Sequence, residues 1–257
     1  MSYAVITGAS SGIGKHFAAV CASQGYDLIL IARRKEALEE IGKVLSERHG
    51  IEYKVLVADL SDMEEVKKTY EEIKSFDIDI FFNNAGLGDA GRFTETDLQK
   101  ELFMIDVNIK ALHAFTKYML SYFKDRGEGY LLNVGSSAGL LPAGPFMATY
   151  YASKSYVVSL SRALAEELKQ EGSRVYVGVL CPGPVNTEFN DVANVEFALP
   201  GISASDCAKA AYRGMKKRQT VIVPTATMKL ARLGSRLLPE PLTVKITAHQ
   251  QKKKKGL

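Results

Sequence analysis

Cysteine and histidine are both scarce in this sequence of 257 residues. The three cysteines, Cys21, Cys181 and Cys207, form no CxxC pair, so the sequence predicts neither a disulfide framework nor a thiolate metal site. The four histidines have no metal-ligand spacing, and we therefore expect no bound metal. Free thiols are typical of a reducing compartment, which leads us to expect a cytoplasmic location.

Long hydrophobic segments are missing as well. No apolar run approaches the roughly 20 residues that a membrane-spanning helix needs. An apolar stretch over residues 3–6 lies directly after the first Met, which leaves no room for the charged and apolar regions of a secretory signal. We therefore expect neither a membrane span nor a signal peptide.

Acidic residues are nearly absent from the C-terminal end. Residues 209–257 contain 13 Lys and Arg and one acidic residue, Glu240, so the other residues hold 20 of the 33 basic and 28 of the 29 acidic side chains. No aromatic residue follows Tyr212, so aromatic side chains are not interleaved with the later basic ones, and we expect no nucleic-acid binding. Apolar and basic residues of 228–238 can occupy different faces of one helix, which Pro239 and Pro241 are expected to break.

Three explanations for this basic arm stay open. It packs on its own domain or on a sister subunit, whose main body is acidic, which predicts a homodimer or homotetramer. Alternatively, it lies on an anionic membrane surface as a peripheral contact. In the third explanation it receives an acidic carrier protein that delivers an acyl group.

Apolar runs alternate with amphipathic segments of helical length along most of the chain. The runs cover residues 3–6, 28–32, 54–57, 78–82, 130–134, 175–180 and 220–223. Continuous Val, Ile and Leu runs separated by helices are typical of buried parallel strands. We predict an α/β fold with a doubly wound, Rossmann-like parallel sheet of about seven strands and helices on both faces. The catalytic and dinucleotide-binding domain is expected to span residues 1–224, and a short helical C-terminal appendage residues 225–257.

A glycine-rich turn, TGASSGIG, follows the first predicted strand. Its three glycines allow a tight turn, a close approach of backbone N–H groups to a phosphate, and close packing of the following helix. The N-terminus of that helix attracts a pyrophosphate. The predicted dinucleotide-binding residues of this turn are Gly8, Ser10, Ser11, Gly12, Ile13 and Gly14.

Two arginines end the second predicted strand, where NAD-binding enzymes place an acidic residue. Arg33 and Arg34 follow Ala32, and a guanidinium group suits a ribose 2′-phosphate. The pair favours NADP(H) over NAD(H), with Arg33 preferred because it lies nearer the strand end. Asp59 and Leu60 follow the third strand, where Asp59 contacts the adenine edge or belongs to the N-cap region of the next helix.

Five blocks occur in the order and spacing of a known family. They are Thr7–Gly14, Asn83–Gly86, Asn108, Tyr150–Lys154 and Pro182–Thr187. Over residues 3–224 the chain resembles the short-chain dehydrogenases/reductases. The resemblance implies an oxidoreductase that uses NADP(H) to interconvert a carbonyl and an alcohol.

The resemblance also assigns roles to individual residues. Tyr150 and Lys154 occupy the YxxxK positions and, four residues apart, share one helix face, whereas Tyr151 points elsewhere. Asn108 matches the asparagine that holds a water linked to the lysine. Residues implied to line the adenosine ribose and back the sheet are Asn83, Ala85 and Gly86, and those of the nicotinamide segment are Pro182, Gly183, Val185 and Thr187.

The catalytic serine has two candidates. Ser136 begins an SxxG element that ends at Gly139, whereas the family's spacing to the tyrosine favours Ser137. We predict Ser136, because one inserted residue between positions 140 and 149 accounts for the spacing.

Tyrosine has an ordinary pKa of about 10, which matches proton transfer at neutral pH poorly. The Lys154 ammonium and the positive charge of oxidised nicotinamide should lower the pKa of Tyr150. Tyr150 would then donate the proton in reduction and accept it in oxidation. Ser136 would hydrogen-bond the substrate oxygen as charge develops there.

Residues expected near the substrate are mostly apolar, although the same residues could simply close the core. They are Leu140, Leu141, Pro142, Phe146, Met147, Phe189, Val192, Val195, Phe197 and Leu199. This lining predicts an apolar carbonyl or alcohol as the substrate. The alternatives are a 3-oxoacyl-thioester reductase and a non-catalytic NADP-sensing protein, and the presence of both Tyr150 and Lys154 disfavours the latter.

Overall fold

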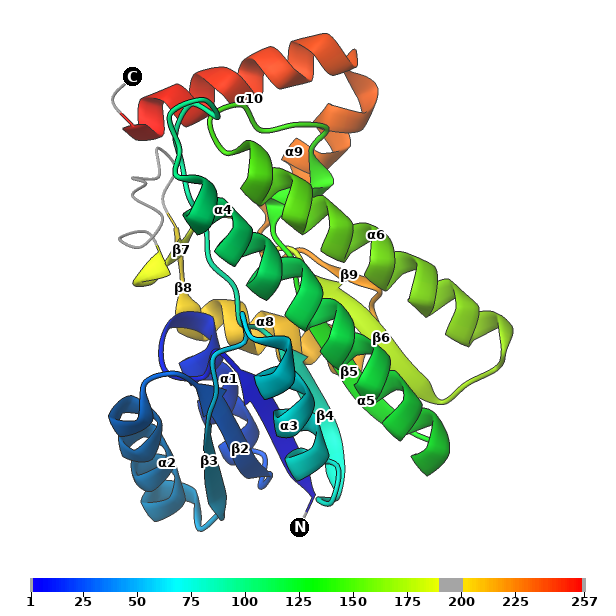
Figure 1. Ribbon diagram of the computed structural model, residues 1–257. Coiled ribbons are helices and arrows are strands. Elements are labelled where there is room, and N and C mark those ends of the chain that lie inside the picture. The colour runs from blue at the N-terminus through cyan, green and yellow to red at the C-terminus, as the bar shows by residue number, and fades with distance from the viewer. Residues whose placement is uncertain (1, 190–200, 256–257) are drawn as a thin grey trace.

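The computed structural model describes residues 2–189 and 201–255, and within them seven parallel strands form one sheet in the order β3-β2-β1-β4-β5-β6-β9 (Figure 1). The strands are β1 (Tyr3–Thr7), β2 (Asp27–Ala32), β3 (Tyr53–Val57), β4 (Ile78–Asn83), β5 (Gly129–Val134), β6 (Val175–Leu180) and β9 (Val221–Ile222). Each lies where the apolar runs predict a strand. Because the strand order reverses between β1 and β4, a crevice opens at their carboxyl ends.

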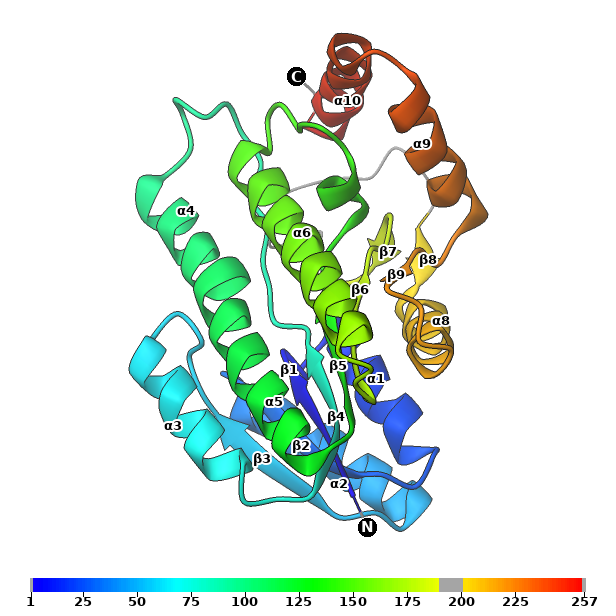
Figure 2. The same cartoon turned by 90° about the vertical axis from the view of Figure 1, so that its right-hand side faces the viewer.

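Helices cover both faces of the sheet, which confirms the doubly wound prediction (Figure 2). One face carries α1 (Gly12–Ala22), α2 (Lys35–His49) and α8 (Ala204–Lys216). The other carries α3 (Met63–Ile73), α4 (Leu98–Ile105), α5 (Leu112–Arg126) and α6 (Ala148–Gln170). Individual residues fix where these helices begin and end. Asp62 caps the N-terminus of α3 by accepting a hydrogen bond from Glu64 N at 2.8 Å, and Gly50 ends α2 because its φ of +66° does not continue the helix.

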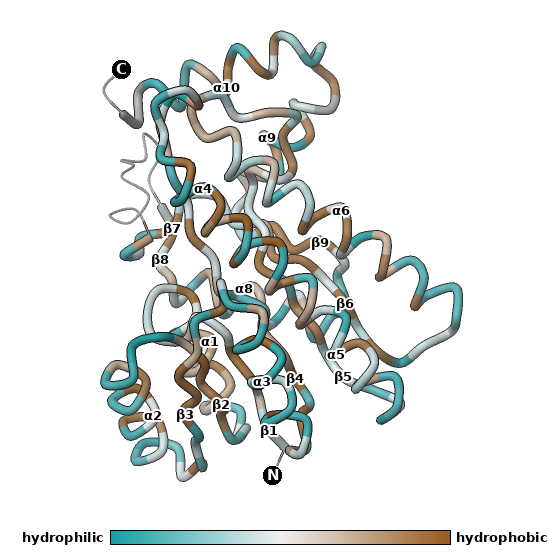
Figure 3. Tube along the Cα trace, viewed as in Figure 1, coloured by the Kyte–Doolittle hydropathy of each residue, from teal (hydrophilic) through white to brown (hydrophobic). Residues whose placement is uncertain are grey.

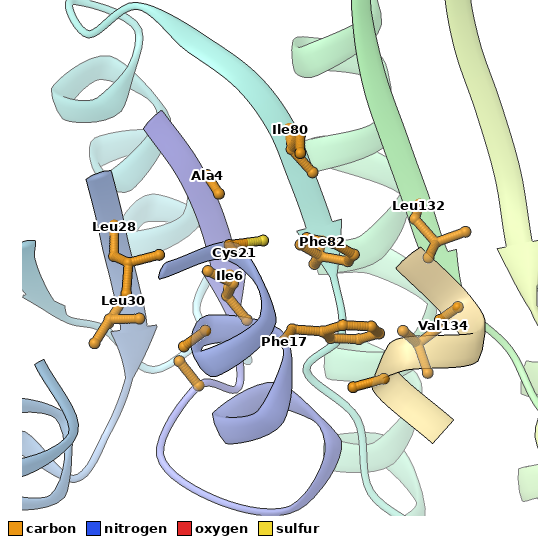
Figure 4. Packing of buried hydrophobic residues seen from close by; sticks show 14 of the residues in the cluster. Ala4, Ile6, Phe17, Cys21, Leu28, Leu30, Ile80, Phe82, Leu132 and Val134 are labelled. Carbon is orange, nitrogen blue, oxygen red and sulfur yellow. The ribbon is translucent and has the colours of Figure 1, made fainter. Parts of the chain in front are cut away.

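The core on the α1 face is built from alternate residues of the strands (Figure 4). Phe17 of α1 stacks on Phe82 of β4 with ring centroids 4.1 Å apart, and both side chains are fully buried. Burying an aromatic side chain of this kind stabilises the fold by about 1.5–3 kcal/mol. This packing fixes α1, and with it the glycine-rich turn, against the carboxyl end of β4.

A π-helical segment lies between α4 and α5. The segment, η1 (Asp106–Ala111), joins α4 to α5 and contains the fully buried Asn108. The Asn108 side chain pairs with the backbone of Leu87 rather than with solvent. Such π-helical turns frequently occur at functional sites.

Two further helices follow the sheet and lie at the end of the molecule opposite the N-terminus (Figure 1). They are α9 (Ala226–Leu237) and α10 (Glu240–Lys255). Pro239 separates them, as predicted, whereas the prediction that Pro241 also breaks the helix is wrong. Pro241 lies in the first turn of α10, where its missing N–H would have no partner in any case.

Two short elements also contribute to the crevice. A pair of two-residue parallel strands, β7 (Val185–Asn186) and β8 (Ile202–Ser203), lies between β6 and β9 in the chain, and a 3-10 turn, η2 (Ser137–Leu140), follows β5. Among the described helices, none is long and apolar enough to cross a membrane.

Candidate functional site

A cavity of about 500 Å³ opens at the carboxyl edge of the sheet and brings together the predicted site residues. Those that line it are Gly8, Ser10, Ser11, Gly12, Ile13, Arg33, Arg34, Asp59, Leu60, Ala85, Gly86, Ser136, Tyr150, Lys154, Pro182, Gly183, Val185 and Thr187. Three predicted residues do not line it: Gly14, Asn83 and Asn108. One continuous space therefore joins the glycine-rich turn to Tyr150.

The glycine-rich turn has a backbone that side chains would obstruct. Gly8 has φ +65°, and a Cβ there would lie 2.9 Å from Ala85 Cα. Gly12 has φ +51°, and a Cβ there would lie 3.3 Å from Thr187 Cγ2, while a Cβ on Gly14 would lie 2.2 Å from the Gly8 oxygen. Gly14 therefore allows α1 to start directly against the turn, and the first-turn N–H groups of α1 remain directed to the cavity.

Side chains tie the carboxyl ends of β1 and β4 together. The Thr7 hydroxyl accepts hydrogen bonds from the N–H groups of Asn84 and Ala85 at 2.9 and 3.0 Å, and Asn84 Nδ2 donates to the Thr7 oxygen at 2.9 Å. Asn84, which the sequence analysis did not select, lines the cavity. Asn83 points away from it and donates to the Leu112 oxygen at 2.9 Å, because successive residues at a strand end face opposite sides.

The two arginines at the end of β2 occupy different surroundings. Arg34 Nε donates to Ser10 Oγ at 3.3 Å and its guanidinium forms a 3.1 Å ion pair with Glu188. The Arg33 guanidinium lies over the Phe103 ring, 5.5 Å from the ring centre. Arg34, rather than the preferred Arg33, therefore contacts the glycine-rich turn. Glu188 was missed because only the folded chain brings it to β2.

Asp59 and Leu60 lie beside the arginines at the carboxyl end of β3. Asp59 Oδ1 accepts hydrogen bonds from the N–H and hydroxyl of Ser61, at 3.0 and 2.9 Å, and the residue lines the cavity. The N-cap of α3 is Asp62, and the Asp59 backbone N–H donates to Glu65 Oε2 in the first turn of that helix. Asp59 therefore lies both in the N-cap region of α3 and beside the cavity, so both interpretations stay open.

Tyr150 and Ser136 meet at the other end of the cavity. The Ser136 side chain hydrogen-bonds Tyr150, and its oxygen accepts from Ala138 N at 3.1 Å, which fixes the hydroxyl at the start of η2. Ser137 also lines the cavity, but its backbone N donates to the Pro182 oxygen at 2.8 Å. The contact with Tyr150 favours Ser136 over Ser137.

Lys154 lies one turn after Tyr150 on α6 and is 3% exposed. Its Nζ donates to the Val134 oxygen at 3.0 Å and lies 5.9 Å from the centre of the Tyr150 ring. Burial lowers the pKa of Lys154 to about 8, because a charged ammonium loses its hydration.

The expected lowering of the Tyr150 pKa is wrong for the polypeptide alone. Burial raises the pKa of Tyr150 to about 12, although the hydrogen bond from Ser136 acts in the opposite direction. The buried Cys181 thiol behind the site also acts to raise it, and burial raises the pKa of Cys181 itself to about 12. Desolvation is therefore the largest effect on the pKa of the Tyr150 hydroxyl.

Asn108 lies behind this pair and orders it. Its Oδ1 accepts from Leu87 N at 3.0 Å, and its Nδ2 donates to the Leu87 oxygen at 2.9 Å and to Ser153 Oγ at 3.1 Å. Ser153 in turn donates to the backbone oxygen of Tyr150 at 2.7 Å. A Cβ on Gly86 would come within 3.1 Å of both Asn108 Oδ1 and Lys154 Nζ, so a larger residue there would push against these two polar groups.

The segment after β6 lines the cavity between the two ends. Val185 of β7 pairs with Ile202 of β8, and the Thr187 side chain lies next to Gly12. A Cβ on Gly183 would lie 2.6 Å from Met228 Cγ, so the start of α9 packs directly on this segment. The C-terminal helices are thereby joined to the site.

Only part of the expected substrate lining is found at the cavity. Met147 and Phe189 line it, and the Phe189 ring lies 5.7 Å from that of Tyr150. Tyr151, expected to point elsewhere, also lines it, as does the unanticipated Leu87. Residues away from the cavity are Leu140, Leu141, Pro142 and Phe146, and those outside the described residues are Val192, Val195, Phe197 and Leu199.

The described part of the chain contains no cluster of side chains suited to binding a metal ion. Over residues 2–189 and 201–255, no group of three or more His, Cys, Asp or Glu side chains is arranged to hold a metal ion.

Comparisons with known proteins agree with this arrangement. Residues 2–196 match the family described as short chain dehydrogenase. The chain is 32% identical over 235 residues to the very-long-chain 3-oxoacyl-CoA reductase of Anas platyrhynchos, covering 88% of this chain and 73% of that protein. It is 34% identical over 165 residues to the 7beta-hydroxysteroid dehydrogenase of Clostridium sardiniense, covering 64% and 63% of the two chains.

A solved structure extends the likeness to three dimensions. The short-chain dehydrogenase from Sphingobium yanoikuyae in complex with NADPH superposes with a TM-score of 0.83 at 30% sequence identity. The superposition covers 92% of this chain and 94% of that one.

Proposed function

The chain belongs to the short-chain dehydrogenase family, and we propose that it is an NADPH-dependent oxidoreductase that interconverts an apolar carbonyl and the corresponding alcohol. One observation carries the proposal. Tyr150, hydrogen-bonded to Ser136 and one helical turn before Lys154, stands in the same cavity as the glycine-rich turn and the two arginines. That cavity provides a dinucleotide site and a proton donor together.

The residues present fit a dinucleotide phosphate. The turn at Gly8 and Gly12 presents backbone where a Cβ would meet other atoms, and the N-terminus of α1 suits a pyrophosphate. Arg33 and Arg34 would hold the 2′-phosphate, and Thr187 and the Val185 backbone the carboxamide of the nicotinamide. The NADPH complex of the Sphingobium relative supports this choice of cofactor. When bound, NADPH supplies the hydride.

Tyr150 would supply the proton that carbonyl reduction also requires. Its hydroxyl donates to the substrate oxygen as negative charge develops there, and Ser136 donates a second hydrogen bond to the same oxygen. The tyrosinate that remains would be stabilised by the Lys154 ammonium on the same face of α6. The backbone oxygen of Val134 accepts a hydrogen bond from that ammonium and holds it in place. In oxidation the same groups act in reverse, with Tyr150 as the base.

Two substrate classes deserve direct comparison. The lining by Met147, Phe189, Leu87 and Tyr151 supports a hydrophobic ketone, as does the likeness to a hydroxysteroid dehydrogenase. A 3-oxoacyl thioester is the second candidate, supported by the likeness to a very-long-chain 3-oxoacyl-CoA reductase. The excess of basic residues after Lys209 suits the phosphates of coenzyme A in such a thioester.

NADPH oxidation, followed at the nicotinamide absorbance, tests the proposal. The panel contains medium-chain ketones, a ketosteroid and a long-chain 3-oxoacyl-CoA, each also assayed with NADH. We expect turnover with at least one of them and a preference for NADPH. Failure of every carbonyl, and of the matching alcohols with NADP, would contradict the proposed activity.

We also propose a homo-oligomer and a cytoplasmic location. Leu98 and Leu102 of α4 are 64% and 43% exposed, and Tyr156 of α6 is 37% exposed on the same side of the sheet. An exposed apolar group of this kind supports a subunit contact there, which light scattering would detect as a dimer or tetramer mass. The three buried free cysteines support the location.

A further inference from the structure

The C-terminal hairpin, defined as α9 and α10 with the turn between them, packs on the site through one face only. Thr243, Thr247 and Gln251 of α10 are each at most 5% exposed and recur every fourth residue. Gln251 Nε2 donates to the hydroxyl of Tyr151, which lines the cavity. The inner face of α10 therefore covers the substrate end of the cavity, in agreement with the first of the three explanations for the basic arm.

The solvent-exposed part of the hairpin, which is its outer face, is unusually apolar. Among the described residues, thirteen large hydrophobic side chains are exposed, and six of them lie in this hairpin. They are Leu230 (69% exposed), Leu233 (56%), Leu237 (78%), Leu238 (41%), Leu242 (45%) and Ile246 (44%). Hydrophobic residues are visible along both helices in Figure 3. Six such residues within 17 positions are a concentration that isolated surface leucines do not explain.

Helical spacing gathers these side chains into stripes. Leu230, Leu233 and Leu237 follow one another at intervals of three and four residues on α9, so they share a face. Leu242 and Ile246 do the same on α10, each directly preceding the buried Thr243 and Thr247. Each helix therefore has an exposed apolar stripe.

Basic residues accompany the apolar ones. Residues 226–257 contain eight Lys and Arg and one acidic residue, Glu240. Lys229 and Lys245 are exposed and adjoin Leu230 and Ile246 in sequence. An apolar stripe bordered by lysines is the composition of helices that lie in the interface of an anionic bilayer.

Charge argues against a second copy of the chain as the occupant. A two-fold contact through this face would place two strongly basic hairpins against each other, with repulsion between like charges. A contact between the hairpin and the acidic body of another copy can close into a two-fold dimer, and the mass of the hairpin variant in solution distinguishes that occupant from a membrane. An anionic membrane satisfies the apolar and the basic residues at once.

We infer that the outer face of the C-terminal hairpin binds the surface of an anionic lipid bilayer, with Leu233 and Leu237 entering the interface. The inner face would remain on Tyr151, so that binding places the substrate end of the cavity beside the membrane. This inference does not depend on the reaction proposed above, because it concerns the surface of the hairpin alone.

Co-sedimentation of the full-length protein with vesicles tests the inference. One vesicle preparation contains equal parts of phosphatidylcholine and phosphatidylserine, the other phosphatidylcholine alone, both at ~0.15 M salt, where charges are screened beyond about 8 Å. We expect binding to the anionic vesicles and at least about a tenfold weaker partition onto the neutral ones, because each basic residue near an anionic surface contributes to binding.

The decisive variant is Leu233→Glu with Leu237→Glu. Its matched control is Val44→Glu with Met63→Glu, which changes two exposed apolar side chains on α2 and α3 by the same charge. We expect the hairpin variant to lose about tenfold or more of the vesicle partition and the control to keep most of it, since only the former loses interfacial apolar area. Urea unfolding of both variants, measured without vesicles, checks that each is folded.

Three results would overturn the inference. The first is a wild type that fails to sediment with either vesicle preparation. The hairpin variant would sediment as well as the control, which would leave charge alone as the cause. Light scattering would show the hairpin variant with a lower mass than the wild type and no change in vesicle binding, which would make the face a contact between subunits.

Discussion

Gln251, in the last helix, donates a hydrogen bond to the hydroxyl of Tyr151, the neighbour of the proposed proton donor. The two side chains lie 100 positions apart in sequence and are 3% and 7% exposed. Gln251 Oε1 is buried without a hydrogen-bond partner among the described residues. The C-terminal helix α10 is therefore joined to α6 at the edge of the cavity.

This contact predicts coupling between the two residues. Tyr151→Phe and Gln251→Leu should each lower the free energy of unfolding by about 1–2 kcal/mol, because each leaves a buried polar group unpaired. The double variant should lose less than the sum by about 1 kcal/mol. Urea unfolding of the four proteins measures this, with Gln251→Leu combined with Tyr176→Phe as an additive control, since Tyr176 bonds Gln219 elsewhere. Additivity in the first set would mean that the hydrogen bond contributes nothing.

The ion pair between Arg34 and Glu188 predicts a competition for the cofactor phosphate. Glu188→Gln should tighten NADPH binding by about two- to fivefold and leave NADH unchanged, because an exposed carboxylate no longer occupies Arg34. Arg34→Ala should weaken NADPH binding by about tenfold, the value of one fork-type phosphate contact. Fluorescence titration with both cofactors measures the affinities.

The control is Glu188→Gln in the Arg34→Ala background, where it should have no effect. An equal gain in that background would show that Glu188 acts on the cofactor directly. If Arg33→Ala abolished the NADPH preference and Arg34→Ala did not, the original choice of Arg33 would be correct.

Lys154 predicts how stability depends on pH in the cofactor-free protein. Its pKa is lowered by burial to about 8, below the ordinary value of 10.5, so the unfolded chain binds more protons between these values. Stability should therefore rise as the pH increases from about 8 towards 10, and the full cost of the buried charge is present below about 8.

Lys154→Met should relieve that cost. We expect the variant to be more stable than the wild type at pH 7 by on the order of 2 kcal/mol, with the difference shrinking towards pH 10. Urea unfolding at several pH values measures it, and Lys169→Met, at an exposed position of the same helix, should change little. A variant less stable than the wild type at pH 7 would show that the ammonium stabilises the fold.

The substrate end of the cavity predicts a response to chain length. For a series of 2-ketones, kcat/KM should rise about threefold to fourfold per added carbon up to a limit, at ~0.8 kcal/mol per buried CH₂. Phe189→Ala should flatten this rise, because the Phe189 ring lies beside Tyr150. A flat response in the wild type, from short to long ketones, would exclude an apolar substrate pocket.

Sequence alone predicts the sheet well because its signal is local. The fully apolar run at Leu28–Ala32 becomes a fully buried strand, and the glycine spacing at 8, 12 and 14 places the turn at the crevice. These features depend on neighbouring residues only. The strand order depends on contacts between distant segments, and the sequence does not predict it.

The remaining site depends on contacts that sequence spacing does not encode. Asn83 and Asn84 are adjacent and identical, and only the position of the strand end decides that Asn84 faces the cavity. Glu188 meets Arg34 across 154 positions, and Gln251 meets Tyr151 across 100. The raised pKa of Tyr150 likewise reflects burial in the folded chain, which is the largest effect on it.

The most direct test of the proposed chemistry compares Tyr150→Phe with Tyr151→Phe. Each variant removes one hydroxyl from neighbouring tyrosines that both line the cavity. With a ketone that the wild type reduces, Tyr150→Phe should lower kcat by about 10²–10⁴-fold while NADPH affinity changes by less than about twofold. Tyr151→Phe should keep most of the turnover. The opposite outcome, with Tyr151→Phe inactive and Tyr150→Phe active, would contradict Tyr150 as the proton donor.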